Sequence, residues 1–214
     1  MKTGIIAEAK VKTDAKDSEA LAHLLRADLL PTSYVPPREF RELRDLVRLR
    51  TYLVRERTRL KNKIRAELAK RRIRVLKDPF AKKRRPMLKR LGIRAVDECL
   101  TVMGSLDKRI REISKELKLK ADNNEDAKLL MTIPGVGYFS ALVIVAEIGD
   151  ISRFSSAEGL CSYAGLVPSI HQSGAMRRSG RITKQGSKML RWVIQESLWS
   201  HLTATPTSRG SSSG

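Results

Sequence analysis

The sequence contains few cysteines and no long apolar segment. Cys99 and Cys161 are the only cysteines, and their spacing matches no metal-binding pattern, which predicts a protein of a reducing compartment. No apolar run approaches the roughly 20 residues that a membrane-spanning helix needs. The N-terminal stretch also lacks the apolar core and cleavage site of a secretory signal. These absences predict a cytoplasmic protein that has no membrane partner.

Acidic residues are scarce relative to basic ones. The chain has 43 Lys and Arg against 23 Asp and Glu, a formal net charge of +20. Such an excess predicts a polyanionic partner, and without a membrane segment that partner is nucleic acid. We therefore expect a protein that binds nucleic acid. Most of the excess lies in residues 38–94, which hold 23 basic and 6 acidic residues. A second basic interval, between Glu158 and Glu196, has no acidic residue and contains six basic ones: Arg177, Arg178, Arg181, Lys184, Lys188 and Arg191.

The apolar periodicity predicts a mainly α-helical chain in four parts. Residues 1–37 contain a strand remnant at 4–7 and a short helix that ends by Pro31. Residues 38–121 form a long antiparallel helical hairpin, with helices at about 38–72 and 95–119 and an apolar seam of the coiled-coil kind that also suits self-association. Residues 122–202 form a helical C-terminal domain, and the Ser/Thr/Gly-rich residues 203–214 form a disordered tail.

The hairpin carries charge of one sign on its polar side. Its connector adds the basic run Lys82, Lys83, Arg84 and Arg85. A charged helix face is commonly just solvated, and mixed signs at a spacing of four residues would favour that interpretation. A face of one sign repels itself unless phosphates neutralise it, which favours contact with DNA or RNA. We therefore expect the hairpin to bind a nucleic-acid backbone without reading its sequence.

Two apolar helices, before Pro134 and after Gly137, are joined by the turn Pro134-Gly135-Val136-Gly137. This pattern is typical of a helix-hairpin-helix, in which the glycines let a phosphate approach the free N–H groups of the second helix. The alternative interpretation is an ordinary corner between two helices. The positive charge of the chain favours the phosphate-binding interpretation for Gly135, Val136 and Gly137.

Three side chains are candidates for chemistry, each with a structural alternative. Asp14 and Asp17 share one helix face and are able to bind Mg²⁺ together, but Asp14 is also a natural N-cap with Asp17 at the third helical position. Ser173 lies in a basic loop predicted for residues 169–180. It can attack a phosphodiester if cations such as Arg177, Arg178 and Arg181 stabilise the phosphorane, or it can simply hold a phosphate in a turn.

Several ordered segments resemble a known family. They are KTDAKDSEALAHLLRADLLPTSYVPP, RELRDLVRLRTYLVRERTRLKNKI, LLMTIPGVG, IGDISRFSSAEGLCSYAGLVPSIHQSG and RITKQGSKMLRWVIQES. Together they are similar to the DEDD-type insertion-sequence transposases of the IS-one-ten group, relatives of the Piv-type DNA invertases. The resemblance implies an N-terminal RuvC-like domain with Asp, Glu, Asp and Asp around Mg²⁺, a coiled coil for assembly, and a C-terminal transposase domain with a serine nucleophile. Members also use a structured guide RNA to pair donor and target DNA. The resemblance further implies that residues 1–37 are the C-terminal remnant of the RuvC-like domain and that the protein is prokaryotic and nucleoid-associated.

Residue by residue, Asp14 and Asp17 match the last two acidic positions of the family, and Ser173 matches the serine of its Ser-Gly motif. The first Asp and the Glu of the family lie upstream, where this sequence has about a dozen residues, and relatives continue after His201. We therefore expect a transposase truncated at both ends, with an incomplete metal site and no strand cleavage of its own. The alternative is a non-catalytic nucleic-acid-binding remnant or regulator that associates with intact transposase.

Overall fold

The computed structural model describes residues 13–29, 34–74, 78–81, 84–173 and 176–204, with only the backbone described at 171–173, 176 and 177. The predicted strand remnant at 4–7 and the basic pair Lys82 and Lys83 lie outside these residues. The chain forms two compact units, residues 1–36 and residues 37–214. The described chain is mainly helical, as predicted, and none of its helices is both long and apolar enough to cross a membrane.

The first unit contains helix α2 (Asp14–Arg26), which has no buried residue. Its N-cap is Thr13, whose side-chain oxygen accepts a hydrogen bond from the Lys16 N–H at 3.3 Å. The prediction of Asp14 as the N-cap was therefore wrong by one residue. The physical reason is that a threonine hydroxyl caps a helix as an aspartate does. Asp14 and Asp17 consequently lie within the first turns of α2, where negative charge suits the helix dipole.

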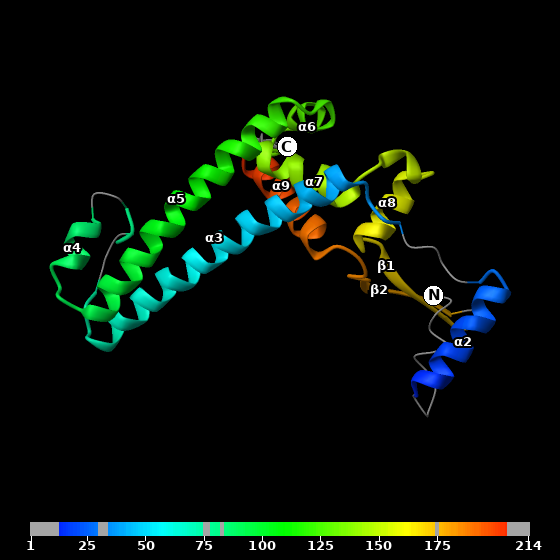
Figure 1. Cartoon of the computed structure of the whole chain (residues 1–214), viewed down its shortest axis with the longest axis horizontal. Helices are drawn as coiled ribbons and strands as arrows, with labels where there is room; N and C mark the ends of the chain where they lie inside the picture. The colour runs from blue at the N-terminus through cyan, green and yellow to red at the C-terminus, as the bar shows by residue number, and fades with distance from the viewer. Residues whose placement is uncertain (1–12, 30–33, 75–77, 82–83, 174–175, 205–214) are drawn as a thin grey trace, which may run out of the picture. The chain divides into compact units, whose positions relative to one another are not determined.

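In the second unit, α3 (Arg38–Lys70) and α5 (Arg94–Asp122) pack along each other (Figure 1). They run antiparallel, because Arg50 bonds Ser114 whereas Arg57, further along α3, bonds Asp107, earlier in α5. The short helix α4 (Arg85–Lys89) lies near the connection between them. We call this pair of helices, with α4, the arm. Both predicted long helices are present, and α5 continues three residues beyond the predicted end.

The arm has two separate apolar cores. The core at its connected end joins α3, α4 and α5 through eight buried residues: Ile64, Leu68, Phe80, Leu88, Ile93, Val96, Leu100 and Met103. The other core begins at Val47 and Leu117 and continues into the C-terminal helices. Between these cores Ile110 of α5 is buried, and Arg50 and Arg57 of α3 donate hydrogen bonds to Ser114 and Asp107 of α5.

The C-terminal helices are α6 (Glu125–Met131), α7 (Tyr138–Ile148), α8 (Ala157–Ala164) and α9 (Lys188–Ala204), with a 3-10 turn at Ile151–Arg153. Helix α7 lies at the centre of this group and has seven buried residues. It packs against α3, α5, α6 and α9. Helix α9 extends to Ala204, so the first two residues of the predicted tail are helical and the others lie outside the described residues.

The predicted loop at residues 169–180 is instead an antiparallel hairpin of two strands. Strand β1 (Pro168–Ser173) pairs with β2 (Met176–Ile182), and Ser173 is opposite Met176. The loop prediction was wrong because polar residues and cations interrupt the alternation that marks a half-buried strand. A two-residue connection that begins with glycine, Gly174-Ala175, was the available sequence signal for a tight hairpin.

Candidate nucleic-acid interface

The positive charge of the arm is concentrated on one of its two long helices. Helix α3 has 12 basic and 5 acidic residues, whereas α5 has 7 basic and 6 acidic residues. Both helices are long and largely solvated, so solubility alone does not explain why their charges differ. The asymmetry makes α3 the candidate side of the arm for contact with a polyanion.

Helical periodicity places most of the exposed cations of α3 on one side. Positions separated by three, four and seven residues share a face of a helix. The members on this solvent-facing side, here called the α3 basic face, are Arg41, Arg48, Arg55, Arg59, Lys63 and Lys70. Tyr52 lies among them and is 57% exposed, while Asp45 is the single acidic residue within this arc. An exposed aromatic ring between arginines is a feature of nucleic-acid surfaces, because rings stack on bases while guanidinium groups bind phosphates.

Two members of the face are available for a ligand, and the other four have acidic partners, among them Arg48, which is paired with the buried Glu147. Arg41 and Arg55 form no side-chain hydrogen bond or ion pair with any residue that the structure describes. Arg59 is bonded to Glu56 at 2.6 Å, an exposed pair of the kind that contributes little to stability. Lys63, Lys70 and Arg71 surround Glu67, and their hydrogen bonds, first that of Arg71, lower the pKa of Glu67 to about 2.

Other cations of the arm hold the fold together. Arg50 donates to the Ser114 hydroxyl and stacks over the ring of Phe139 at 4.2 Å. Asp107 accepts hydrogen bonds from Arg85 at 2.6 Å and Arg57 at 3.3 Å. Burial alone would raise the pKa of Asp107, but these two hydrogen bonds outweigh it, so that pKa lies below its ordinary value.

The predicted DNA-binding run in the connector is therefore partly committed to the arm itself. Arg85 donates to the Phe80 carbonyl as well as to Asp107, and Arg84 donates to the Asp78 carbonyl at 3.1 Å. Their contact with DNA stays a prediction. No sequence pattern distinguishes these two arginines from free ones, because their partners lie on segments that fold back onto them.

The two glycines of the turn between α6 and α7 differ in backbone conformation and in the space around them. Gly135 has a φ of +91°, and a Cβ built there would lie 2.5 Å from the Ser197 carbonyl oxygen and 2.7 Å from the His201 nitrogen. Gly135 therefore lets the turn pack against α9. Gly137 is the N-cap of α7, has no neighbour within 4 Å of such a Cβ, and provides no side-chain cap. The start of α7 thus has uncapped N–H groups beside an open position, and Val136 between the glycines is half-buried.

The β1–β2 hairpin gathers the second group of predicted residues. Ser173 is the last residue of β1, and in the register Arg177 is opposite Gln172 and Arg178 is opposite His171. Arg178, Arg181, Lys184 and Lys188 are exposed. The structure thus brings the predicted serine and the predicted cations onto one two-stranded element and the segment that follows it. The helix pair α6–α7 and this hairpin were predicted separately, and both belong to the second compact unit.

The predicted metal ligands belong to the first unit. Asp14 is exposed and Asp17 is half-buried, and neither forms an ion pair with a described residue. Among the described residues there is no group of three or more His, Cys, Asp or Glu side chains arranged around a common point. Two carboxylates on one helix face fit a Mg²⁺ ion, which often takes one or two protein carboxylates and completes its shell with water and phosphate.

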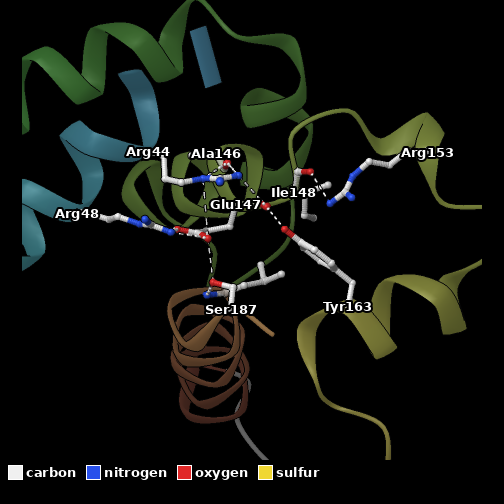
Figure 2. A network of polar contacts seen from close by, with 9 residues as sticks. Arg44, Arg48, Ala146, Glu147, Ile148, Arg153, Tyr163 and Ser187 are labelled. Carbon is white, nitrogen blue, oxygen red and sulfur yellow. Dashed lines mark hydrogen bonds and ion pairs between the residues drawn. The ribbon is translucent and has the colours of Figure 1, made fainter. Parts of the chain in front are cut away.

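Sequence reasoning missed a buried polar network centred on Glu147 (Figure 2). Glu147 is 2% exposed and accepts hydrogen bonds from Arg48 and Ser187. Arg44, Tyr163 and Arg153 donate to the last carbonyls of α7, those of Ala146, Glu147 and Ile148. The only local signal was one acidic residue in the otherwise apolar sequence of α7. Its partners lie 16 to 103 residues away, so spacing did not reveal them.

Comparison with known proteins finds matches to transposase families in both compact units. The profile described as "Transposase IS116/IS110/IS902 family" matches residues 127–211, and a profile of the DEDD type, described as "Transposase", matches residues 5–71. The first match includes the α6–α7 turn and the β1–β2 hairpin. The second includes Asp14, Asp17 and all of α3.

Individual relatives agree with these matches. The chain is 32% identical to the transposase for insertion sequence element IS1111A of Coxiella burnetii, over 86% of this chain and 53% of that protein. It is 29% identical to a probable family 20 transposase of Pseudomonas aeruginosa, over 86% of this chain and 57% of that protein. The pilin gene-inverting protein of Moraxella bovis is 44% identical over 33% of this chain and 22% of its own length. This chain spans about half the length of its long-matching relatives, and it belongs to the IS116/IS110/IS902 family of insertion-sequence transposases.

Proposed function

We propose that this chain binds DNA along the α3 basic face and takes part in DNA recombination as part of an insertion-sequence transposase. The observation that carries the proposal is the asymmetry of the arm. Helix α3 places six cations on one solvent-facing side, whereas α5 has nearly equal numbers of acidic and basic residues. Because like charges on one face repel each other, a regular array of phosphates stabilises that face.

The dimensions of the face support a duplex as its ligand. From Arg41 to Lys70 the helix rises about 43 Å at 1.5 Å per residue, which exceeds the roughly 34 Å of one DNA turn. The uncapped start of α7 offers N–H groups to a further phosphate. Tyr52 adds a stacking surface, worth about 1–3 kcal/mol wherever an unpaired base reaches it.

For the chemistry, we propose Ser173 as the nucleophile. Its oxygen attacks the phosphorus of a DNA phosphodiester, a new Ser–O–P bond forms, and the bond to one deoxyribose oxygen breaks. The serine proton passes to a carboxylate or solvent base, and the departing oxygen takes up a proton. Attack by the hydroxyl of another strand would reverse these steps and release the serine. The support is the place of Ser173 at the end of β1, the basic residues that follow it, and its match to the serine motif of the family.

Mg²⁺ is the proposed metal, and Asp14 and Asp17 are its proposed ligands in this chain. When bound, Mg²⁺ stabilises the negative charge that develops on a phosphodiester under attack. The two carboxylates are suited to it, because they share one face of α2 and have no ion-pair partner among the described residues. Further acidic ligands are expected from the resemblance, which implies four acidic positions around the metal.

We propose two further partners: a guide RNA, which the family resemblance implies, and a second copy of this chain, which the arm would contact. A structured guide RNA would meet the same positive charge, because its phosphates are equivalent to those of DNA for the α3 basic face. Self-association through the arm would bring together two copies of the interface. Copurification of a defined RNA tests the first proposal, and light scattering of the purified chain tests the second.

The DNA-binding proposal is tested by removing charge from one face at a time. Substituting Arg41, Arg55 and Arg59 together by Gln should reduce the slope of log K against log salt concentration by about 3, since each lost phosphate contact removes about 0.9. The matched control replaces Lys108, Lys115 and Lys118 of α5 by Gln, which removes the same charge from exposed positions. Fluorescence anisotropy with a labelled duplex measures both. Equal losses in the two variants would refute the assignment of the interface to α3.

The proposal that Ser173 is the nucleophile is tested separately, by detecting a covalent bond between protein and DNA. With supercoiled DNA, Mg²⁺ and an added upstream segment of a relative that supplies the other acidic ligands, Ser173 should yield a covalent protein–DNA adduct that survives denaturation. Neither Ser173→Ala in that mixture nor the unaltered chain without the added segment should yield any. Ser179→Ala, a neighbouring serine on β2, is the control that retains the adduct. Tight, salt-dependent binding without any adduct would instead favour the alternative, a nucleic-acid-binding module that works beside an intact transposase.

A further inference from the structure

Glu147 is a buried carboxylate that the proposed function does not use. It is 2% exposed and lies near the end of α7. Removing a carboxylate from water costs several kcal/mol, and an apolar residue of similar volume would avoid that cost. Paired networks of this kind often fix one geometry rather than add stability. The partners of Glu147 therefore indicate which segments are held together.

Two of these partners come from α3. Arg48 donates from Nε and Nη2 to the Glu147 Oε1 atom at 3.0 and 2.9 Å, a bidentate contact that fixes both side chains. Arg44 donates to the Ala146 carbonyl oxygen at 3.0 and 2.8 Å and lies 4.0 Å from Glu147 Oε2. Figure 2 shows both guanidinium groups directed at the end of α7. Helix α7 is thereby fixed to the helix that carries the basic face.

The other partners flank the β1–β2 hairpin. The Ser187 hydroxyl donates to Glu147 Oε2 at 2.9 Å and accepts from the Leu190 N–H at 3.1 Å, so Ser187 also caps α9. The Tyr163 hydroxyl donates to the Glu147 carbonyl oxygen at 3.1 Å. Tyr163 lies five residues before β1, and Ser187 lies five residues after β2. The same glutamate therefore holds both segments through which the hairpin is attached.

The stem of the hairpin transmits this restraint to the strands. The Thr183 N–H donates to the Val167 carbonyl at 2.9 Å, and the Lys184 N–H donates to the Gly165 carbonyl at 3.1 Å. Gly186 has a φ of +109°, and a Cβ there would collide with the Tyr163 carbonyl oxygen. With the two sides of the stem bonded and in close contact, a shift at either anchor moves the strands as a body.

We propose that Glu147 is a positioning residue, which fixes the orientation of the β1–β2 hairpin relative to the α3 basic face. Its relevance to DNA chemistry rests on the proposed function, because Ser173 ends β1. The geometric part does not depend on that function. It is testable in the absence of DNA, so the two proposals fail independently.

The test is a distance measurement between the arm and the hairpin. Spin labels are placed at Ala66→Cys on α3 and Ser179→Cys on β2, both exposed positions, with Cys99→Ala and Cys161→Ser to remove the native thiols. The otherwise unchanged chain should give one narrow distance distribution. Glu147→Gln should broaden or shift it, because the amide keeps the size of the side chain but loses the charge that holds Arg48.

Glu67→Gln is the matched control. Glu67 is also buried, at 7% exposed, but its ion-pair partners Lys63, Lys70 and Arg71 all lie within four residues of it, in α3 or at its C-cap. Losing that charge should leave the distance distribution unchanged. An unchanged distribution in folded Glu147→Gln, or an equal change in Glu67→Gln, would overturn the proposal.

A milder variant guards against loss of folding. Ser187→Ala removes the hydrogen bond from Ser187 to Glu147 and the side-chain cap of α9 but leaves the Arg48–Glu147 pair, so it should broaden the distribution to a smaller extent. If Glu147→Gln does not fold and Ser187→Ala keeps the narrow distribution, the proposal is wrong. In the DNA assay, Glu147→Gln should keep the salt slope but form roughly 10- to 100-fold less Ser173 adduct, the loss typical of a nucleophile displaced by about 1 Å.

Discussion

At the scale of single residues, the two glycines of the α6–α7 turn have different roles. Gly135 combines a positive φ with a close approach to the α9 backbone at Ser197 and His201. Gly137 has an ordinary extended conformation and open space around it. A sequence motif presents the two as equivalent members of a phosphate-binding turn, but only the second has room for a phosphate at its Cβ position.

Gly135→Ala should therefore lower the free energy of unfolding by about 2–4 kcal/mol, the sum of the strain of a positive φ and of overpacking against a backbone. Gly137→Ala should cost about 1 kcal/mol or less, because an N-cap substitution to alanine typically costs about that much and a Cβ at this position meets no neighbour. Urea denaturation of both variants measures the difference. Similar losses in the two would mean that the turn does not pack on α9 as described.

At the scale of elements, the long helices were predictable and the hairpin was not. Helices α3 and α5 have an apolar stripe that persists over many turns, so the period of 3.6 residues is unmistakable. Strands of six and seven residues give few repeats, and the cations of β2 interrupt them. The α6–α7 turn was found from its Pro-Gly sequence, but its contact with α9, some 60 residues later, has no local signature. For the same reason Glu147 passed unnoticed.

At the same scale, ion pairs join α3, α4 and α5, and we expect them to contribute to the free energy of unfolding. Asp107 of α5 holds Arg57 of α3 and Arg85 of α4, and its side chain is 19% exposed. Asp107→Asn should lower the free energy of unfolding by about 1–3 kcal/mol at pH 7, since two charge-assisted hydrogen bonds are lost. Glu112→Gln, which breaks an exposed pair with Arg109, should cost no more than about 0.5 kcal/mol.

The Asp107 effect should also depend on pH with a defined sign. The folded state lowers the pKa of Asp107, so its contribution is complete above the unfolded pKa of about 4 and is lost as pH falls through the folded pKa. The difference in stability between the unaltered chain and Asp107→Asn should thus shrink as the pH is lowered below about 4. Denaturation series from pH 7 to pH 3 measure it, and a difference that grows toward acid would contradict the assignment.

At the scale of the whole molecule, stability and charge both reside in residues 37–214. Both apolar cores are built from residues after Pro37, and α2 has no buried residue. Residues 1–36 contain five basic and five acidic residues, so the full net charge of +20 remains without them. The proposed metal ligands Asp14 and Asp17, in contrast, both belong to this first unit. Folding and DNA binding should therefore be separable from the metal-dependent step.

A chain that starts at Pro37 should keep the unfolding midpoint of the full chain and the same salt slope for DNA, since it keeps both described apolar cores and the full net charge. Thermal denaturation and the anisotropy assay measure these two quantities. In the adduct assay with the added upstream segment, the chain that starts at Pro37 should form no Ser173 adduct, and Asp14→Asn with Asp17→Asn in the full chain should reproduce that loss without affecting binding. A lower unfolding midpoint of the shortened chain would contradict the first expectation, and adduct formation by the shortened chain would remove Asp14 and Asp17 from the chemistry.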